Sequence, residues 1–395
     1  MDLRVFKNEP GSPLLQIGVI DELTSLIWTD KYFGVGSVQL QAPMTPNNIS
    51  LIKCGNFLIM HDGEPAAYIG PAEGIMYDFE YRRGMVLTYV HYIRDAEGQE
   101  LIEASGSSLS SILNQRLVVD VSHVHSGDRI SEHIYNLVKY NIGFGTDNSR
   151  AYSPQIDFIN TSPLGGTSNY APEPLRPLGD AVRDLCIAAK IGYDLLACDD
   201  LQHRIFALWL YEGQDLTVNN TDGNDPVVFS IDFDNVLEQE FEDDISNIAT
   251  VAYVQGAEDS EGVREVVTVN PTSSLTREHR YELFVDGSDI PRQANDVDIP
   301  VATYRQYLTT KGLQALAQNV ENLTFNSAIN LNSNLQYNVD FKLGDRVTCQ
   351  DARWGVTINS RITALTHTYE GGYVRLEATF GESAPTLLEK IKKVR

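Results

Sequence analysis

Short runs that alternate apolar and polar residues stand near both ends of this chain and constrain its fold more than any other feature. The clearest are SVQLQA at residues 37–42 and VRLEATF at residues 374–380. A period of two predicts strands with one buried face. Further strands are predicted at Phe57–Met60 and at residues 346–350. Met76–Tyr81 and Met85–Ile93 flank Arg83-Gly84, which suggests a hairpin, and a turn is expected at Asp62-Gly63. So many short strands favour a small barrel or sandwich.

The middle of the chain changes to helical periodicity. A short helix is predicted around Leu109–Leu113, and a longer one over Ile130–Tyr140, with Asp128 as N-cap and Gly143 as its stop. A second long helix follows Pro177 and ends by Gly192, before two strands at Tyr193–Ala197 and Arg204–Tyr211 around Asp199-Asp200. Another helix, weakened at Gly312, covers Val301–Gln318.

The predicted fold class is therefore α+β, mostly β, with α+β domains between two small β-barrel domains. The expected order is a first β-barrel (1–106), an α/β insert with a long loop (107–172), a helix plus hairpin (173–226), a second β-barrel with one helix (227–383) and a basic C-terminal helix (384–395).

Charge excludes several functions. The 395 residues hold 30 Lys and Arg against 54 Asp and Glu, a net charge of −24. This balance argues against a general nucleic-acid binder and against docking on an anionic membrane. No apolar run reaches about 18 residues, so we expect no membrane insertion. The first residues lack the apolar core of a signal peptide.

The four cysteines are predicted to be buried thiols in a reducing compartment. Cys54, Cys186, Cys198 and Cys349 are widely spaced, and none forms a C-x-x-C pair. Such spacing indicates neither a disulfide framework nor a zinc site.

One polar cluster is the best candidate for metal binding or catalysis. Its members are Asp120, His123, His125, Asp128, Glu132 and His133. On a strand, His123 and His125 would point to one side and could share a metal. The alternative is a polar loop before a helix, with Asp128 capping it and His133 on its wet face. We favour the loop, because the third ligand and its supporting residues are unspecified.

Other motifs are weaker. Asp222-Gly223, within Asn220–Asp225, resembles part of a calcium loop, but Val218 and Phe229 stand where an EF-hand needs acids, so a hydrophilic turn is favoured. Gly106-Ser107-Ser108 is explained more easily as a helix start than as a nucleophile motif. Gly34-Val35-Gly36 and Gly165-Gly166 lack the context of phosphate loops. The aromatic stretch Tyr77–Tyr92 is read as cross-strand core pairs rather than a sugar platform. We therefore expect no catalytic residue, no metal and no cofactor.

Several longer segments resemble one family in sequence order. They are SLIWTDKYFGVGSVQLQAP (25–43), GSSLSSILNQR (106–116), YEGQDLT (211–217) leading into VVFSIDFDNVLEQEF (227–241), YELFVDGSDI (281–290), and VDFKLGDRVTCQDARWGVTINSRITAL (339–365) closing with EATFGE (377–382). Together they resemble the ReqiPepy-type siphophage tail protein family, relatives of baseplate hub proteins. Ile112 stands where that family favours Leu.

The resemblance implies a structural virion protein. Its relatives form a homotrimeric ring that closes the distal end of the tail tube, with two β-barrels per subunit. The implied partners are copies of itself, distal tail, tail tube and tape-measure proteins, further fibre or spike proteins, and DNA in passage. Because the chain ends soon after Glu382, we expect any lytic or peptidase activity to lie on another chain.

An acidic lumen would repel phosphate and let DNA pass without holding it, although the acidity also serves solubility. The basic tail, Ala384–Arg395, would dock on an acidic neighbour. Two other functions stay open: a binding module for cell-wall carbohydrate, which predicts an exposed aromatic patch, and a cell-wall hydrolase, which predicts paired carboxylates or a metal in one cleft.

Overall fold

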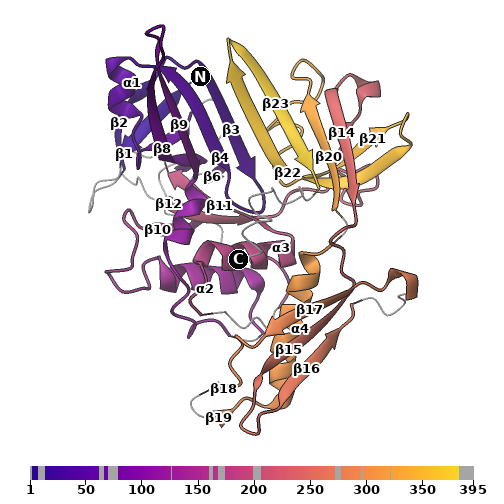
Figure 1. Ribbon diagram of the computed structural model, residues 1–395. Helices are drawn as coiled ribbons and strands as arrows, with labels where there is room; N and C mark the ends of the chain where they lie inside the picture. The colour runs from indigo at the N-terminus through magenta and orange to yellow at the C-terminus, as the bar shows by residue number, and fades with distance from the viewer. Residues whose placement is uncertain are drawn as a thin grey trace.

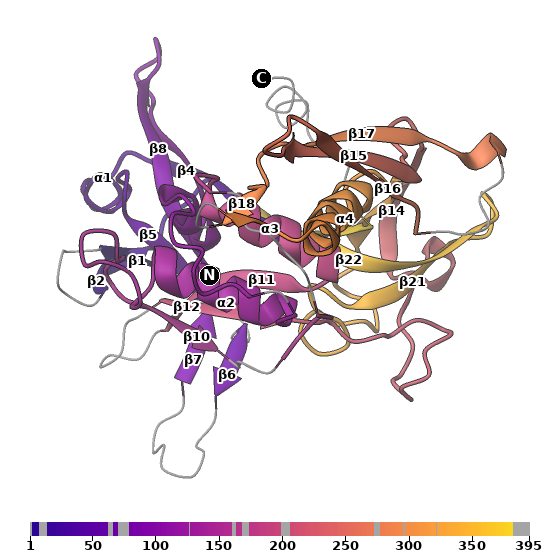
Figure 2. The same ribbon diagram turned by 90° about the horizontal axis from the view of Figure 1, so that it is seen from below.

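The computed structural model describes residues 2–7, 14–61, 66–69, 79–125, 127–159, 163–167, 174–198, 206–271, 277–294, 297–320 and 322–381 (Figures 1 and 2). The predicted turn at Asp62-Gly63, Asp199-Asp200 and the basic tail lie outside these residues. None of the described helices is long and apolar enough to cross a membrane.

A sheet of 13 strands forms the β part of the molecule. Its first half, the N-terminal lobe, consists of β1 (Leu3–Lys7), β2 (Leu15–Ile20), β3 (Ser25–Lys31), β4 (Ser37–Pro43), β5 (Phe57–Met60), β8 (Gly84–Arg94) and β9 (Glu100–Ser108), with helix α1 (Pro46–Leu51). Its second half, the C-terminal lobe, consists of β13 (Val228–Phe229), β14 (Val236–Asp244), β20 (Asn322–Ile329), β21 (Arg346–Asp351), β22 (Val356–Glu370) and β23 (Tyr373–Phe380), with the 3-10 turn η2 (Ile231–Phe233).

Alternation decides which face of each strand is buried. Val38, Leu40 and Ala42 of β4 point into the core of the N-terminal lobe, and the residues between them are exposed. In the C-terminal lobe, Phe229 and Phe380 pack at a ring-centroid distance of 5.0 Å inside a cluster of buried aromatic rings. Each lobe therefore has its own core, as the period-two pattern predicts.

One strand pair joins the two lobes into a single sheet. The 15-residue strand β22 pairs with β21 along its first half and with β23 along its second. The second half also pairs with β3, and the hydroxyl groups of Thr29 and Thr366 lie 3.0 Å apart across this pair. Figure 1 shows the result, the yellow strands of the C-terminal lobe beside the indigo strands of the N-terminal lobe. The strand order is an open path from β14 to β2. The two closed barrels stay a prediction.

A separate α/β layer packs beneath the N-terminal lobe. Its five strands are, in sheet order, β10 (Ile156–Ile159), β12 (Phe206–Tyr211), β11 (Gly192–Cys198), β7 (Phe79–Arg82) and β6 (Ala67–Ile69). Its helical elements are η1 (Leu109–Gln115), α2 (Ile130–Asn141) and α3 (Leu178–Ala189). Apolar residues of α2, α3, η1 and β11 meet in the largest hydrophobic core, with Phe6 and Phe57 contributed by the lobe.

A third unit is inserted between β14 and β20. It consists of β15 (Val251–Glu258), β16 (Arg264–Val269), η3 (Arg277–His279), β17 (Glu282–Gly287), the short pair β18 (Gln293–Ala294) and β19 (Val297–Asp298), and α4 (Val301–Ala317). The helix runs unbroken through Gly312, where a Cβ would lie 2.6 Å from Val269 Cγ2. This glycine therefore allows close helix–sheet packing, and its predicted weakening of the helix stays a prediction.

Three local predictions are wrong. The strand before Arg83-Gly84 does not form a hairpin with the strand after it, because β7 pairs with β11 and β6, whereas β8 pairs with β9 and β5. The chain therefore passes from one sheet to the other at Arg83.

The ends of two helices also differ from the prediction. Helix α2 has Arg129, not Asp128, as N-cap, and Glu132 accepts a hydrogen bond from the Arg129 backbone N–H. Helix α3 ends at Ala189, where Lys190 adopts a left-handed conformation, and Gly192 already begins β11.

Candidate functional site

The outer face of the joined sheet is a wide surface built from regular strands of both lobes. It spans eight antiparallel strands in the order β14, β20, β23, β22, β3, β4, β9 and β8, and we define it as the face that points away from the two β cores. Uncharged polar residues occupy its centre: Ser25, Thr29, Gln39, Gln41, Ser105, Thr366 and Thr368. Ile27, 38% exposed, lies among them between Thr368 and Gln39, so the centre is a solvated, mainly polar surface with one apolar side chain.

Acidic residues outnumber basic ones on this outer face. Its charged side chains are Glu103, Glu238, Glu240, Glu242, Glu370 and Glu377 against Lys31 and Arg375. The guanidinium of Arg375 is already shared by Glu238, at 2.6 Å, and Glu377, at 2.7 Å. The three outward glutamates of β14 follow at alternate positions, so they form one acidic row. A polyanion meets net negative charge along this surface.

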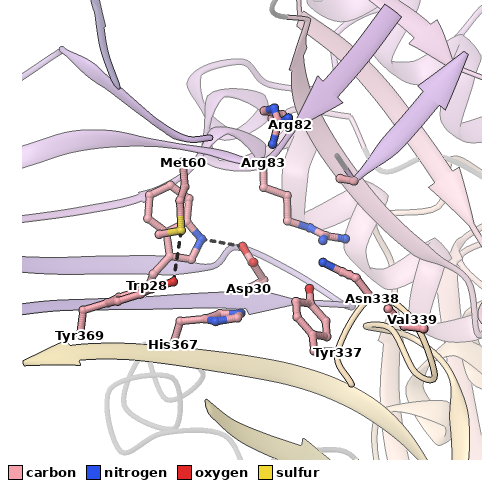
Figure 3. Close-up of a pocket in the computed structure, with 11 residues that line it drawn as sticks. Trp28, Asp30, Met60, Arg82, Arg83, Tyr337, Asn338, Val339, His367 and Tyr369 are labelled. Atoms are coloured by element: carbon pink, nitrogen blue, oxygen red, sulfur yellow. Dashed lines mark hydrogen bonds between the residues drawn. The ribbon is translucent and has the colours of Figure 1, made fainter. Parts of the chain in front are cut away.

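A cavity of about 380 Å³ lies beneath the β3–β22 pair, where the two lobes and the α/β layer meet. Figure 3 shows side chains from all three parts pointing toward it. Its lining consists of Trp28, Asp30, Met60, Ala66, Arg82, Arg83, Tyr337, Asn338, Val339, His367 and Tyr369. The lining contains no Ser, Thr, Cys or Lys, and its side chains capable of nucleophilic or acid–base chemistry are one carboxylate, one histidine and two tyrosines.

Buried charges lie in the lining of this cavity and directly behind it. The Arg83 guanidinium binds Asp194 of β11 at 2.9 Å, and both side chains are largely buried, with exposed fractions of 16% and 8%. The Trp28 indole donates to Asp30 Oδ1 at 3.0 Å. Burial raises the pKa of Asp194 to about 6, against the opposing effect of Arg83, and burial also raises the pKa of Asp30. Arg83 thus compensates carboxylates contributed by two different sheets.

The titratable rings of the cavity are held neutral near pH 7. Burial lowers the pKa of His367 to about 4, and the nearby charge of Arg83 acts in the same direction. Burial raises the pKa of Tyr337 to about 12. The two rings pack with centroids 5.4 Å apart. The cavity is therefore a polar joint between the parts of the molecule, built around one charged cluster.

The predicted histidine cluster is dispersed. Residues 120–125 form turns rather than a strand, so His123 and His125 do not share one side. The His123 ring stacks on Tyr140 at a centroid distance of 3.6 Å. His133 is buried, not on a wet face, and its Nε2 lies 2.9 Å from the carbonyl oxygen of His125. Asp128 accepts from the His125 backbone N–H at 3.3 Å. No three His, Cys, Asp or Glu side chains of the described residues are placed to hold one metal ion.

The loop Asn220–Asp225 is closed by amide side chains. Asn220 binds the backbone of Thr217 and Asn224, and Asn224 Nδ2 donates to the Asp215 carbonyl at 3.0 Å. Asp222 is exposed, and Gly223 has a φ of +78°. The geometry is that of the predicted hydrophilic turn.

The glycine motifs serve strand packing. A Cβ at Gly106 would lie 2.1 Å from the Val86 carbonyl oxygen, and one at Gly36 would lie 2.3 Å from that of Thr29. Ser108 Oγ accepts from the Gly36 backbone N–H at 3.0 Å, so both motifs hold the β4–β9 region together. The predicted short helix is present as η1, which begins directly after Ser108.

The cysteine prediction holds for three of the four thiols. Cys186, Cys198 and Cys349 are buried, whereas Cys54 is exposed, because it lies in the turn between α1 and β5.

The tyrosines of the aromatic stretch are also divided between the core and the surface. Tyr81 is a core residue, but Tyr89 and Tyr92 are 53% and 46% exposed. These two tyrosines alternate across β8 and point to opposite faces, so they form no common platform.

Sequence reasoning missed the charged cavity residues. Asp30 follows Trp28 at an inward position of β3, and Asp194 lies within the fully buried strand β11. A carboxylate at a core position of an apolar strand is costly unless it is compensated. An acidic residue at an inward position of an otherwise apolar strand was therefore the sequence feature that could have identified Asp30 and Asp194. The partner Arg83 could not be assigned, because the predicted hairpin placed it in a turn.

Comparisons by sequence and by structure both relate this chain to phage tail proteins. The family model for siphovirus ReqiPepy6 Gp37-like protein matches residues 3–382. Prophage tail protein gp18 from Listeria monocytogenes EGD-e is 12% identical with a TM-score of 0.52, and the alignment covers 100% of this chain and 98% of that one. The tail protein from Neisseria meningitidis MC58 is 12% identical with a TM-score of 0.50 and 97% coverage of both chains. No curated protein matches the chain in sequence. The fold is thus that of phage tail proteins, and the chain belongs to the siphovirus ReqiPepy6 Gp37-like protein family.

Proposed function

We propose that this protein is the hub of a phage tail tip, where three copies form a ring that closes the distal end of the tail tube and opens for DNA. The observation that carries this proposal is the outer face, a polar and acidic surface built from both lobes through the β3–β22 pair. A subunit with one continuous sheet face supplies a wide, smooth segment of a channel wall.

The charge of the outer face suits a passing polyanion. Phosphate binding needs clustered Lys and Arg, and each such contact makes a nucleic acid adhere. Arg375 is neutralised by two glutamates, and the centre of the face offers hydroxyl and amide groups. DNA in such a channel stays hydrated and is not held.

The proposed location is the tail of the virion, at its tip. The partners are other copies of the chain, the distal tail protein, the tail tube and the tape-measure protein, with fibre or spike proteins below. The role is structural and needs no cofactor. In the cavity beneath the β3–β22 pair, the buried charges are paired with one another and join the parts of the molecule, which supports a structural role over a cell-wall hydrolase.

Mass measurement and DNA binding test the proposal together. The purified chain is expected to form a trimer that does not retard duplex DNA at moderate salt. Introducing Gln39→Lys, Gln41→Lys and Thr368→Lys at the centre of the outer face is expected to make the trimer retain DNA.

The matched control adds the same charge elsewhere, by Asn219→Lys, Thr221→Lys and Ser260→Lys at exposed, uncharged turn residues. These are expected to retain DNA more weakly. A monomeric protein would overturn the proposal, and so would a parent trimer that binds DNA, or equal retention by the two lysine variants.

A further inference from the structure

Three polar side chains that line the cavity beneath the β3–β22 pair have hydrogen-bonding capacity that the described residues do not use. Asp30, only 8% exposed, accepts a hydrogen bond from the Trp28 indole at Oδ1, and its Oδ2 receives none from the described part of the chain. The ring nitrogens of His367 and the hydroxyl of Tyr337 likewise have no hydrogen-bond partner among those residues. Figure 3 shows the three side chains directed toward one space.

All three groups can accept a hydrogen bond. An ionised carboxylate is an acceptor only, a neutral imidazole has one acceptor nitrogen, and a phenol oxygen accepts as well as donates. His367 is neutral near pH 7, because burial lowers its pKa to about 4. The groups come from β3, from β22 and from the loop between β20 and β21, so they approach the cavity from different sides. This arrangement suits a ligand with several N–H donors on one atom.

The buried charge at the cavity is incompletely compensated. The carboxylates of Asp30 and Asp194 share the guanidinium of Arg83, which binds Asp194 at 2.9 Å. The other guanidinium of the lining, that of Arg82, is bound by Glu80 at 2.7 Å. Burial raises the pKa of Asp30 against the opposing effect of Arg83, as expected for a desolvated carboxylate without a full countercharge. A bound cation supplies that charge. Because Asp194 balances Arg83, this guanidinium does not exclude a second cation beside Asp30.

The rest of the lining favours an organic cation over a metal ion. A hard metal ion takes about six or more oxygen ligands, and the lining contains a single carboxylate. Met60, Trp28 and Tyr369 form an apolar wall beside the acceptors, with the Tyr369 hydroxyl 3.5 Å from the Met60 sulfur. Such a wall suits a short hydrocarbon stem.

The cavity is large enough for such a ligand and is open to solvent. Its volume of about 380 Å³ lies at the lower end of the range of about 300–1,000 Å³ found for small-molecule sites. Val339 of the lining is 71% exposed, so the loop that carries Tyr337 forms part of the rim.

We infer that this cavity is a binding site for a primary alkylammonium group, with the ammonium on Asp30, His367 and Tyr337 and the hydrocarbon stem against Trp28 and Met60. The site goes beyond the proposed hub and lies within one subunit, so it does not depend on the number of copies in a ring. A free alkylamine and the lysine side chain of a neighbouring protein carry the same group.

Calorimetric titration of the full chain with pentylammonium chloride tests the site. We expect saturable binding at a single site per chain. 1-Pentanol has the same stem without the charge, and we expect it to bind about tenfold more weakly or less, because hydrogen bonds to a charged group are the stronger ones. Equal affinity for the two would mean that the cavity takes up hydrocarbon only, which overturns the inference.

Asp30→Asn is the main variant, because asparagine keeps the shape of the side chain and an oxygen that can accept from Trp28, but removes the charge. We expect the affinity for pentylammonium to fall by about 10- to 100-fold. Asp21→Asn is the matched control, since it removes the same charge from an exposed residue between β2 and β3, and it is expected to keep the parent affinity. Parent affinity in Asp30→Asn, or an equal loss in both variants, contradicts the site.

Tyr337→Phe keeps the test decisive if Asp30→Asn does not fold. It retains the ring that packs on His367 at a centroid distance of 5.4 Å and removes the hydroxyl alone. We expect the affinity to fall by about 2- to 10-fold, with the fold verified by circular dichroism. Unchanged affinity in this variant overturns the proposed ligand position.

A capped lysine, Nα-acetyl-lysine methylamide, distinguishes the two sources of the ligand. Binding as tight as that of pentylammonium identifies a lysine side chain of a partner protein, whereas binding of pentylammonium alone identifies a free amine. If neither compound binds, the site is wrong. The proposed hub then stands, because the mass of the oligomer and its retention of DNA test it separately.

Discussion

At the scale of single residues, the buried Arg83–Asp194 pair has the largest predicted effect on stability. Arg83→Met leaves the Asp194 and Asp30 carboxylates buried without the guanidinium that compensates both of them. Removing one partner of a buried ion pair costs about 3–5 kcal/mol. We expect a loss of this size in the free energy of unfolding, measured by denaturant titration.

Glu238→Gln is the control for that measurement, because it breaks the exposed Arg375 pair at 2.6 Å. Exposed pairs contribute less than about 1 kcal/mol. Equal losses in the two variants would show that the cavity charges are hydrated, contrary to their burial.

His367 makes stability depend on pH. Its pKa is about 4 in the folded chain, against an ordinary value of 6.5, so the unfolded chain binds the proton first as pH falls. Its contribution is complete above pH 6.5 and is lost as pH falls toward 4, by about 3 kcal/mol. We expect His367→Gln to flatten the fall in unfolding free energy between pH 7 and about 4.5.

The parent and the variant must be compared at each pH, because Asp194 acts in the opposite direction. Its folded pKa of about 6 lies above the ordinary value of 3.8, so its contribution grows as pH falls. An unchanged slope in the variant would mean that His367 is accessible to protons in the folded chain.

At the scale of elements, Gly106 shows how closely the strands approach one another. It lies in β9 beside the bulge of β8, and an added methyl group would meet the Val86 carbonyl oxygen at 2.1 Å. We expect Gly106→Ala to lower the free energy of unfolding by about 1–3 kcal/mol, as overpacking does. Thermal or denaturant unfolding measures this.

Gly166→Ala is the matched control, since no atom lies within 4 Å of its added Cβ and its φ is not in the left-handed range. It is expected to change stability by less than about 0.5 kcal/mol. A Gly106→Ala variant as stable as this control would mean that the β8 bulge relaxes freely.

Local periodicity predicted the elements far better than their pairing. α2 and α4 begin at the predicted residues, and β4, β5, β11 and β23 occupy the predicted ranges within one residue, because amphipathic spacing is a local property. The false hairpin at Arg83-Gly84 arose where two adjacent strands join different sheets. Pairing depends on contacts distant in sequence, such as β22 with β3, and no local pattern encodes them.

At the scale of the whole molecule, the resemblance predicted more than the residues did. Composition showed that the chain is acidic but not where the acidic residues lie. The row of outward glutamates on β14 could be recognised only once the outward face of that strand was known. The cavity forms where the two lobes and the α/β layer meet. Its charged residues therefore come from segments far apart in the sequence, and no motif with a fixed spacing connects them.

The acidity has a consequence for assembly. Each copy carries a net charge of −24, so copies repel one another over distances that depend on salt. Screening acts over about 10 Å at 0.1 M salt and about 3 Å at 1 M. Contacts between copies therefore form against this repulsion, and added salt favours them by screening it. We therefore expect the oligomeric fraction at fixed protein concentration to rise with sodium chloride, measured by sedimentation velocity. Dissociation on adding salt would instead mean that attractive ion pairs hold the copies together, and the acidic rows would then have to face basic surfaces of a neighbour rather than the passage.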